Sequence, residues 1–177
     1  MKTAFLGLGS NLGDRRGHLA EALRCLAADP AISIVGGSSV YESKPVGVIE
    51  QPDFLNMVVQ VETTHPPLSL LSSCLGVEAR LGRERRERWG PRNIDIDVLI
   101  YDQLLWCDDR LVLPHPRMRE RSFVLTPLAE IAPDVNVNGV GALVLAARVG
   151  TEGLRRVASW GELAETGGIP PRKVRAP

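Results

Sequence analysis

The sequence is poor in cysteine, in aromatic side chains and in net charge, and each shortage excludes a class of protein. Its cysteines, Cys25, Cys74 and Cys107, are odd in number and form no CxxC pair. This pattern argues against a disulfide framework or a zinc site and favours a reducing compartment. Lysine plus arginine and aspartate plus glutamate number 21 each, so the basic excess typical of nucleic-acid coats and membrane-surface proteins is missing.

Long apolar runs are missing as well. No stretch approaches the ~20 apolar residues of a membrane span, and the N-terminal apolar run is too short for a secretory signal. We therefore expect a cytoplasmic protein without a membrane partner. The 177 residues suit one domain with a real core, which we assign to residues 1–150. Residues 151–177 are expected to be a partly mobile C-terminal extension, because their end is rich in glycine, proline and basic residues.

Apolar periodicity predicts the element order β-α-β-β-α-β over the first hundred or so residues. Strands are expected at residues 3–8, 32–41, 53–63 and 94–101, with a bulge at residues 36–37, and helices at residues 14–28 and 66–81. This order is that of a ferredoxin-like α+β fold, an antiparallel sheet covered on one face by two helices. C-terminal additions follow: a hairpin formed by residues 104–105 and 111–113, and helices at residues 122–131 and 141–149.

Two aspartates mark the most informative strand. Asp95 and Asp97 alternate with apolar residues, so both carboxylates point to one face of the strand. At ~4 Å they would repel each other by roughly 1–4 kcal/mol, depending on the effective dielectric. A hard divalent cation removes that penalty, and Mg²⁺ favours one or two carboxylates together with phosphate oxygens and waters. The alternative interpretation is an ordinary solvated strand face.

Arginines are dense just before this strand, namely Arg80, Arg83, Arg85, Arg86, Arg88 and Arg92. Guanidinium groups match phosphate oxygens in pairs, although Glu84 and Glu87 among them would also suit a salt-bridged, solvated loop. Trp89 lies in the same polar segment, where there is little local core to join. We interpret the segment as a lid that closes over a polyphosphate and its metal. The alternative is that Trp89 packs into the core and anchors the loop.

A candidate acceptor pocket combines aromatic rings with an amide. Phe54 and Asn56 share a strand face by the same alternation, and Phe123 comes from later in the chain. A ring that stacks and an amide that both donates and accepts suit a flat, hydrogen-bonding heterocycle. The alternative places both phenylalanines in the core.

Familiar nucleotide-binding motifs are absent. There is no GxxxxGK[ST] P-loop. Residues 7–13, GLGSNLG, have GxGxxxG spacing rather than the dinucleotide-binding fingerprint. We expect instead a tight turn that brings residues 10–13 near the site.

Several motifs in this order resemble those of the 6-hydroxymethyl-7,8-dihydropterin pyrophosphokinases. The matching segments are GLGSNLGD at residues 7–14, SSVYESKPVG at 38–47, QPDFLN at 51–56, GRERRERWGPRNIDIDVLIYD at 82–102 and LPHPRMRERSFVLTPLAEIAPD at 113–134. The resemblance implies ATP-dependent transfer of pyrophosphate to the hydroxymethyl group of a dihydropterin, with release of AMP, in folate biosynthesis.

The resemblance also implies roles for particular residues. Asp95 and Asp97 would hold two Mg²⁺ ions that bridge the ATP phosphates, and Arg83 and Arg92 would stabilise the transferring group. The other expected nucleotide contacts are Glu78, Arg85, Trp89, Val98, Arg110, Leu111, His115 and Arg121. The expected pterin contacts are Ser43, Lys44, Val46, Phe54, Asn56 and Phe123.

Two other functions stay open at this point. A ferredoxin-like sheet with surface aromatics and an arginine-rich loop is also typical of RNA- or DNA-binding modules. The zero net charge, the aromatic content of 5% and the two acids within the basic zone argue against nucleic acid. The other function is that of a pterin-binding protein without catalysis, or of the kinase half of a larger folate enzyme, although the length argues against a fused partner within this chain. We expect ATP and a dihydropterin as partners, and a monomer.

Overall fold

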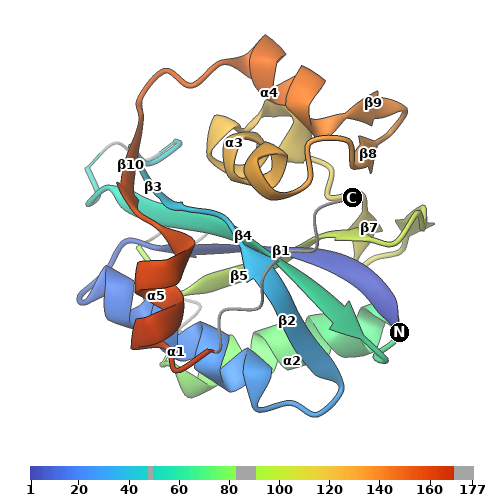
Figure 1. Cartoon of the computed structure of the whole chain (residues 1–177), viewed down its shortest axis with the longest axis horizontal. Helices are drawn as coiled ribbons and strands as arrows, with labels where there is room; N and C mark the ends of the chain where they lie inside the picture. Colours follow the sequence, from blue (N-terminus) through green and yellow to red (C-terminus); the bar gives the residue numbers. More distant parts are fainter. Residues whose placement is uncertain (48–49, 83–90, 170–177) are drawn as a thin grey trace.

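The protein folds around one antiparallel sheet of six strands, and the computed structural model describes residues 1–47, 50–82 and 91–169. The strands are β1 (Lys2–Ser10), β2 (Ile32–Gly37), β3 (Val40–Ser43), β4 (Phe54–Thr63), β5 (Asp95–Tyr101) and β10 (Leu154–Ala158). They lie in the order β10-β3-β4-β1-β5, and β2 also pairs with β4 (Figure 1). The predicted ferredoxin-like α+β fold is confirmed, since β1 lies between β4 and β5, the two strands that the crossover helix between them connects.

The central strand β1 explains why both faces of the sheet are covered. Leu6 and Leu8 pack with the core residues of one face, whereas Phe5 packs with those of the other, as the two-residue period of a strand requires. None of the three is more than 5% exposed. Each face therefore needs a layer of helices to exclude water.

Helices α1 (Arg15–Ala27) and α2 (Pro67–Arg80) cover one face, as the sequence predicts. The Asp14 carboxylate caps α1 by accepting a hydrogen bond from the Gly17 amide at 2.9 Å. Pro67 suits the first turn of α2, where its missing amide hydrogen leaves no helical bond unmade.

A second helical layer covers the opposite face, where the sequence analysis expected none. It contains the short 3₁₀ helix η1 (Met118–Glu120) and the helices α3 (Ser122–Ile131) and α4 (Ala142–Val149). Leu125 of α3 is buried with Phe5 and Val58 of the sheet. The helical segments themselves agree with the prediction, and their position follows from apolar side chains on both sides of β1 and β4.

Two short hairpins complete this half of the molecule. Strand β6 (Trp106–Cys107) pairs with β7 (Val112–Leu113), and β8 (Asn136–Val137) pairs with β9 (Val140–Gly141). The first is the predicted hairpin, although its first strand begins at Trp106 rather than at Leu104.

The sequence predicts one strand over residues 32–41, and this prediction is wrong because the structure divides that segment into β2 and β3. Ser38 lies between them, and its hydroxyl accepts a hydrogen bond from the Val58 amide at 3.0 Å. Gly37 contacts the Trp160 ring so closely that a Cβ there would lie 2.4 Å from a ring carbon. The predicted irregularity is present, as a register shift between Ile34 and Gly36.

Strand β10 and helix α5 (Trp160–Thr166) lie in the predicted C-terminal extension, residues 151–177, where the sequence indicated no particular helix or strand. Strand β10 pairs with β3, so the central sheet continues beyond residue 150. Helix α5 begins with a capping box, in which Ser159 and Glu162 exchange hydrogen bonds with each other's amides. Residues 170–177 lie outside the described part of the chain. Among the helices described, none has the length and apolar character that crossing a membrane requires.

Candidate active site

A cavity of about 360 Å³ opens where the second half of β1 lies between the starts of β4 and β5. Gly9 pairs with both Asn56 and Asp95, and Gly7 pairs with Asp97. Directly opposed residues on neighbouring strands point to the same face. The two glycines therefore form a floor without side chains, flanked by an amide on one strand and by two carboxylates on the other.

The glycines of β1 are required by this close packing. A Cβ on Gly9 would lie 3.1 Å from the Asn56 Oδ1 atom, and a Cβ on Gly7 would lie 3.3 Å from a Leu99 methyl carbon. Both glycines line the cavity. They belong to the strand itself, and the chain leaves β1 only after Ser10.

The two aspartates lie at the start of β5. Asp95 and Asp97 both line the cavity and are half-buried, whereas Ile94, Ile96 and Val98 are buried. The predicted shared face is thus observed. Asp95 Oδ2 lies 2.6 Å from Arg92 Nη1, so the carboxylate pair has a cation beside it where the chain enters the strand.

Cationic and imidazole groups line the same cavity as these acids, namely those of Arg92, His115, Arg117 and Arg121. Burial lowers the pKa of Arg121, and Asp97 and Asp95 partly oppose that change. A guanidinium group stays charged despite such a shift. Arg121 therefore brings a largely desolvated positive charge to the site, where charge-assisted hydrogen bonds are strong.

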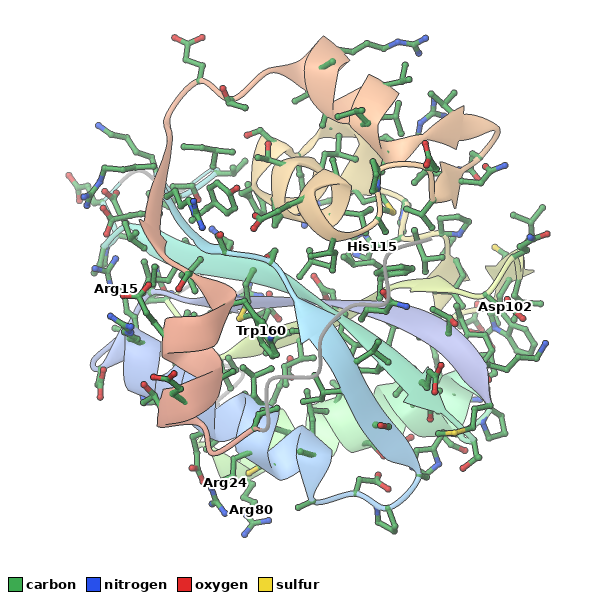
Figure 2. The ribbon with its side chains drawn as sticks, viewed as in Figure 1. Arg15, Arg24, Arg80, Asp102, His115 and Trp160 are labelled. Atoms are coloured by element: carbon green, nitrogen blue, oxygen red, sulfur yellow. The ribbon has the colours of Figure 1, made fainter. Side chains whose placement is uncertain are left out.

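His115 is held in one tautomer between the sheet and the second helical layer (Figure 2). Its amide donates to the Leu99 carbonyl at 2.8 Å, and its Nδ1 atom accepts from the Arg117 amide at 3.3 Å. Burial, with the charge of Arg121 adding to it, lowers the pKa of His115 to about 4. At neutral pH the imidazole is thus uncharged, and Nε2 carries its one proton.

The other end of the cavity is suited to a flat heterocycle. Phe54 and Phe123 line it together with Asn56. Asn56 is only 6% exposed, and its amide nitrogen donates to the Ser43 hydroxyl at 2.8 Å. This bond fixes the amide orientation. Lys44 and Val46 continue the same wall of the cavity.

Four of the expected nucleotide contacts do not line this cavity: Glu78, Val98, Arg110 and Leu111. Val98 and Leu111 belong to the buried core beneath the sheet. Glu78 is 2% exposed, and its carboxylate accepts a hydrogen bond from the Ile96 amide at 2.7 Å. It therefore supports β5 between the two aspartates. Arg83, Arg85 and Trp89 lie outside the described residues.

Residues 10–13 were expected near the site, but no role was predicted for Asn11, which joins the segments around the cavity. Asn11 is fully buried. Its Oδ1 atom accepts from the Arg92 amide at 2.8 Å, and its Nδ2 atom donates to Gln51 Oε1 and to the Pro52 carbonyl, each at 3.2 Å. An asparagine directly after a glycine-rich strand is the only sequence signal for this role. Gln51 and Arg117 also line the cavity without having been expected.

Comparison with known proteins gives one consistent result. Residues 5–133 match the family model described as 7,8-dihydro-6-hydroxymethylpterin-pyrophosphokinase. A 2-amino-4-hydroxy-6-hydroxymethyldihydropteridine pyrophosphokinase of Methylorubrum extorquens is 50% identical over 157 residues, which are 89% of this chain and 99% of that protein. The protein of the same name from Bacillus subtilis is 43% identical over 139 residues, or 78% of this chain and 83% of the relative.

A solved structure from Plasmodium falciparum has a similar fold. Its HPPK-DHPS protein matches 88% of this chain with a TM-score of 0.68 and 15% sequence identity. The chain spans 48% of that larger protein. At this identity the likeness concerns the fold alone.

Proposed function

This chain belongs to the 7,8-dihydro-6-hydroxymethylpterin-pyrophosphokinase family and is therefore a transferase of folate biosynthesis, and we propose that its cavity binds a dihydropterin beside the polyphosphate of ATP. One observation carries this proposal: a pair of acids, a set of cations and an aromatic pair with an amide line the same cavity. Each group suits one part of the two substrates, and the cavity brings the parts together.

The pterin would lie between Phe54 and Phe123. Two phenyl rings can stack on both faces of a flat bicyclic ring. Asn56 would form hydrogen bonds with the edge of the pterin, because an amide offers both donors and an acceptor. Its bond to Ser43 supports a fixed orientation. Lys44 and Val46 would contribute main-chain groups, as the family resemblance implies.

The aspartate pair fits magnesium by the chemistry of its donors. Asp95 and Asp97 present carboxylates from one strand face into a cavity large enough for phosphate groups. No group of three or more acidic, histidine or cysteine side chains that could hold a metal is found among the described residues. Mg²⁺ commonly binds to only one or two carboxylates, with phosphate oxygens and waters completing its octahedron. We therefore propose that Asp95 and Asp97 hold Mg²⁺ with ATP, which would neutralise the phosphate charge.

The phosphates would be bound by Arg92, Arg121 and His115. The guanidinium groups supply paired donors, and the neutral imidazole supplies its Nε2 hydrogen without adding charge. Arg83, Arg85 and Trp89 remain predicted contributors from the loop outside the described residues. For Glu78, Val98, Arg110 and Leu111 a role near the nucleoside stays a prediction.

The chemistry that these side chains support is in-line displacement. The hydroxymethyl oxygen of the pterin forms a bond to the β-phosphorus of ATP while the bond from that phosphorus to the bridging α,β-oxygen breaks. AMP leaves with the electron pair, and the hydroxyl proton passes to solvent. The side chains act by orienting the two substrates and by stabilising charge on the transferring group.

One assay tests the function. The protein is incubated with ATP, Mg²⁺ and 6-hydroxymethyl-7,8-dihydropterin, and the nucleotide products are separated. We expect AMP in amounts equal to the pyrophosphorylated pterin, and none when the pterin is omitted or when EDTA is in excess. Formation of ADP would contradict the proposal. Pterin binding without turnover would favour a binding protein, and salt-sensitive binding of an oligonucleotide without AMP would favour the nucleic-acid alternative.

Three further expectations stay predictions. They are a monomer, a cytoplasmic location, and the division of the chain into a pyrophosphokinase domain over residues 1–150 and a C-terminal extension over residues 151–177. Gel filtration of the purified chain checks the first of these.

A further inference from the structure

The carboxylate of Glu130, which lies outside the cavity, links helix α3 to strand β3. Helix α3 carries the proposed pterin-binding residue Phe123, and β3 carries Ser43. Glu130 lies in the last turn of α3. Its Oε1 atom accepts from the Ser39 amide at 3.0 Å and from the Ser39 hydroxyl at 2.8 Å, and its Oε2 atom accepts from the Tyr41 hydroxyl at 2.9 Å. Hydrogen bonds to an ionised acceptor are stronger than neutral ones, and here the donors come from β3 and from the residue before it.

The C-terminal strand adds a fourth member. Arg156 of β10 donates from Nε to the Ser39 hydroxyl at 2.7 Å, and Ser39 is only 1% exposed. The hydroxyl thus accepts from Arg156 and donates to Glu130. We call these four residues, Ser39, Tyr41, Glu130 and Arg156, the Glu130 clamp.

The Glu130 clamp connects the two walls of the heterocycle end of the cavity. Phe123 lies in the first turn of α3, the helix that carries Glu130. Ser43, at the end of β3, is paired with Phe54 and accepts the hydrogen bond of Asn56. A flat ring can stack on both phenyl rings only if α3 and β3 keep a fixed separation. The hydrogen bonds that Ser39 and Tyr41 donate to Glu130 tie α3 to β3.

From this arrangement we infer that Glu130 is a positioning residue for the pterin, an inference that rests on the proposed function. Glu130 does not line the cavity. It holds Phe123 opposite Phe54 and Asn56, and so it sets the affinity for the pterin without touching it. The ATP phosphates are bound mainly from the start of β5 and from the segment around His115, and only Arg121, at the start of α3, links them to the helix that Glu130 holds.

The test compares Glu130→Ala with Glu130→Gln. The alanine variant removes every hydrogen bond of the carboxylate. We expect it to raise the KM for the dihydropterin roughly ten- to a hundredfold, as small misplacements in binding sites do, and to raise the KM for ATP by a much smaller factor, because Arg121 is the one proposed phosphate ligand of the described residues that adjoins α3. The glutamine variant should recover most of the affinity, because its oxygen accepts from Ser39 and its amide nitrogen donates to the Tyr41 hydroxyl.

A matched control separates positioning from stability. Val137 is fully buried in the same core as α3 and α4 but has no part in the Glu130 clamp. Val137→Ala should lower the melting temperature and leave the pterin KM unchanged. Binding of 6-hydroxymethylpterin, followed by its own fluorescence, gives a second readout that needs no turnover.

The outcomes are distinct. An unchanged pterin affinity in Glu130→Ala would overturn the inference. Equal losses of affinity for ATP and for pterin, in proportion to the drop in melting temperature in both Glu130→Ala and Val137→Ala, would overturn it as well. If the wild type binds pterin but forms no AMP, the proposed function fails while the fluorescence titration still tests Glu130. If Glu130→Ala does not fold, Tyr41→Phe, which removes one donor, should weaken pterin binding by a smaller factor, and no weakening there would overturn the inference.

Discussion

Arg92 and Asp95 form an ion pair, with Nη1 2.6 Å from Oδ2, at the point where the chain enters β5. Their side chains are 22% and 24% exposed, so the pair is partly shielded from water. A cation proposed for phosphate binding is thus held by a carboxylate proposed for metal binding. In the proposed complex, ATP and its metal would let each partner exchange one opposite charge for another. Such an exchange would keep both charges compensated.

The metal-site assignment predicts that uncharged replacements of the acids stop the reaction. We expect Asp95→Asn and Asp97→Asn to reduce AMP formation by at least on the order of 10²–10³, with the half-saturating Mg²⁺ concentration raised wherever activity remains. Circular dichroism should show an intact fold. Asp102→Asn is the matched control, because Asp102 follows the other end of β5 and forms an ion pair with the exposed Lys2. Near-normal rates in the first two variants would remove the assignment.

The glycine floor of the cavity predicts a specific effect on pterin binding. In Gly9→Ala the new methyl group would lie 3.1 Å from Asn56 Oδ1, so the amide must shift. We expect a roughly tenfold higher KM for the dihydropterin and little change for ATP. Gly76→Ala in α2 is the control, because a Cβ there meets nothing within 4 Å. That change should stabilise the protein by about 0.5–1 kcal/mol and leave both constants unchanged.

The parts of the fold that the sequence predicts are those fixed by local patterns. The alternation around Asp95 and Asp97 determined their shared face, and Asp14 and Pro67 marked the starts of two helices. The division at Ser38 was missed because the contacts found there are long-range: the Ser38 hydroxyl accepts from the Val58 amide, and Trp160 packs on Gly37. No local sequence pattern predicts a contact between residues so far apart in the chain.

The position of the second helical layer could not be predicted either, because the amphipathic pattern of a helix does not indicate which face of a sheet the helix will cover.

For Glu78, the family resemblance predicts a contact with the nucleotide, whereas the helical pattern predicts burial. Glu78 continues the buried stripe of Leu70, Cys74 and Val77 along α2, so the helical period already indicated burial. Its contact with the Ile96 amide makes it a support of the acidic strand.

His115 provides a prediction about protonation in the ligand-free protein. Because burial and Arg121 lower its pKa to about 4, it should be neutral from pH 6 to 8, with the proton on Nε2. Nitrogen chemical shifts of the histidine ring check both points. The folded pKa of His115 lies below the unfolded value of about 6.5, so the unfolded chain binds the proton more readily between these two values. The free energy of unfolding is therefore not reduced by His115 above pH ~6.5, and it falls as the pH drops from there toward 4. His115→Gln should flatten that part of the pH–stability curve. A ring that titrates near 6.5 would contradict the assignment.

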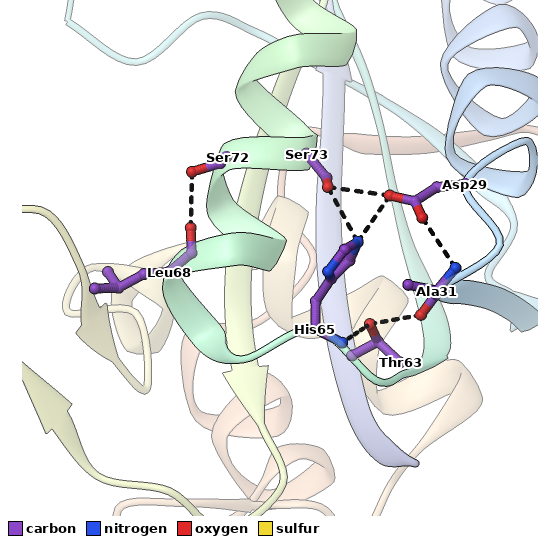
Figure 3. Close-up of polar contacts among 7 residues, drawn as sticks. All are labelled: Asp29, Ala31, Thr63, His65, Leu68, Ser72 and Ser73. Atoms are coloured by element: carbon purple, nitrogen blue, oxygen red, sulfur yellow. Dashed lines mark hydrogen bonds and ion pairs between the residues drawn. The ribbon is translucent and has the colours of Figure 1, made fainter.

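Asp29, His65 and Ser73 form a polar cluster that joins the end of α1 to α2 (Figure 3). Asp29 Oδ2 lies 2.8 Å from His65 Nε2 and accepts from the Ser73 hydroxyl at 3.1 Å. Burial acts to raise the pKa of Asp29, but the bonds from His65, the Ala31 amide and Ser73 outweigh it and leave that pKa lowered. A lowered carboxyl pKa stabilises the fold above the unfolded value of about 3.9, and the contribution disappears as the pH falls through the folded value.

We therefore expect Asp29→Asn to destabilise the protein at pH 7 by about 1 kcal/mol, or roughly 2–4 °C in melting temperature. Its stability should also decline less steeply than that of the wild type below about pH 4. Thermal unfolding from pH 7 to 3 measures both. None of the three residues lines the cavity, so AMP formation at 25 °C should be unchanged. Asp134→Asn, at an exposed position, is the control. A wild-type acid response in Asp29→Asn would mean that the cluster joins the two helices by packing alone.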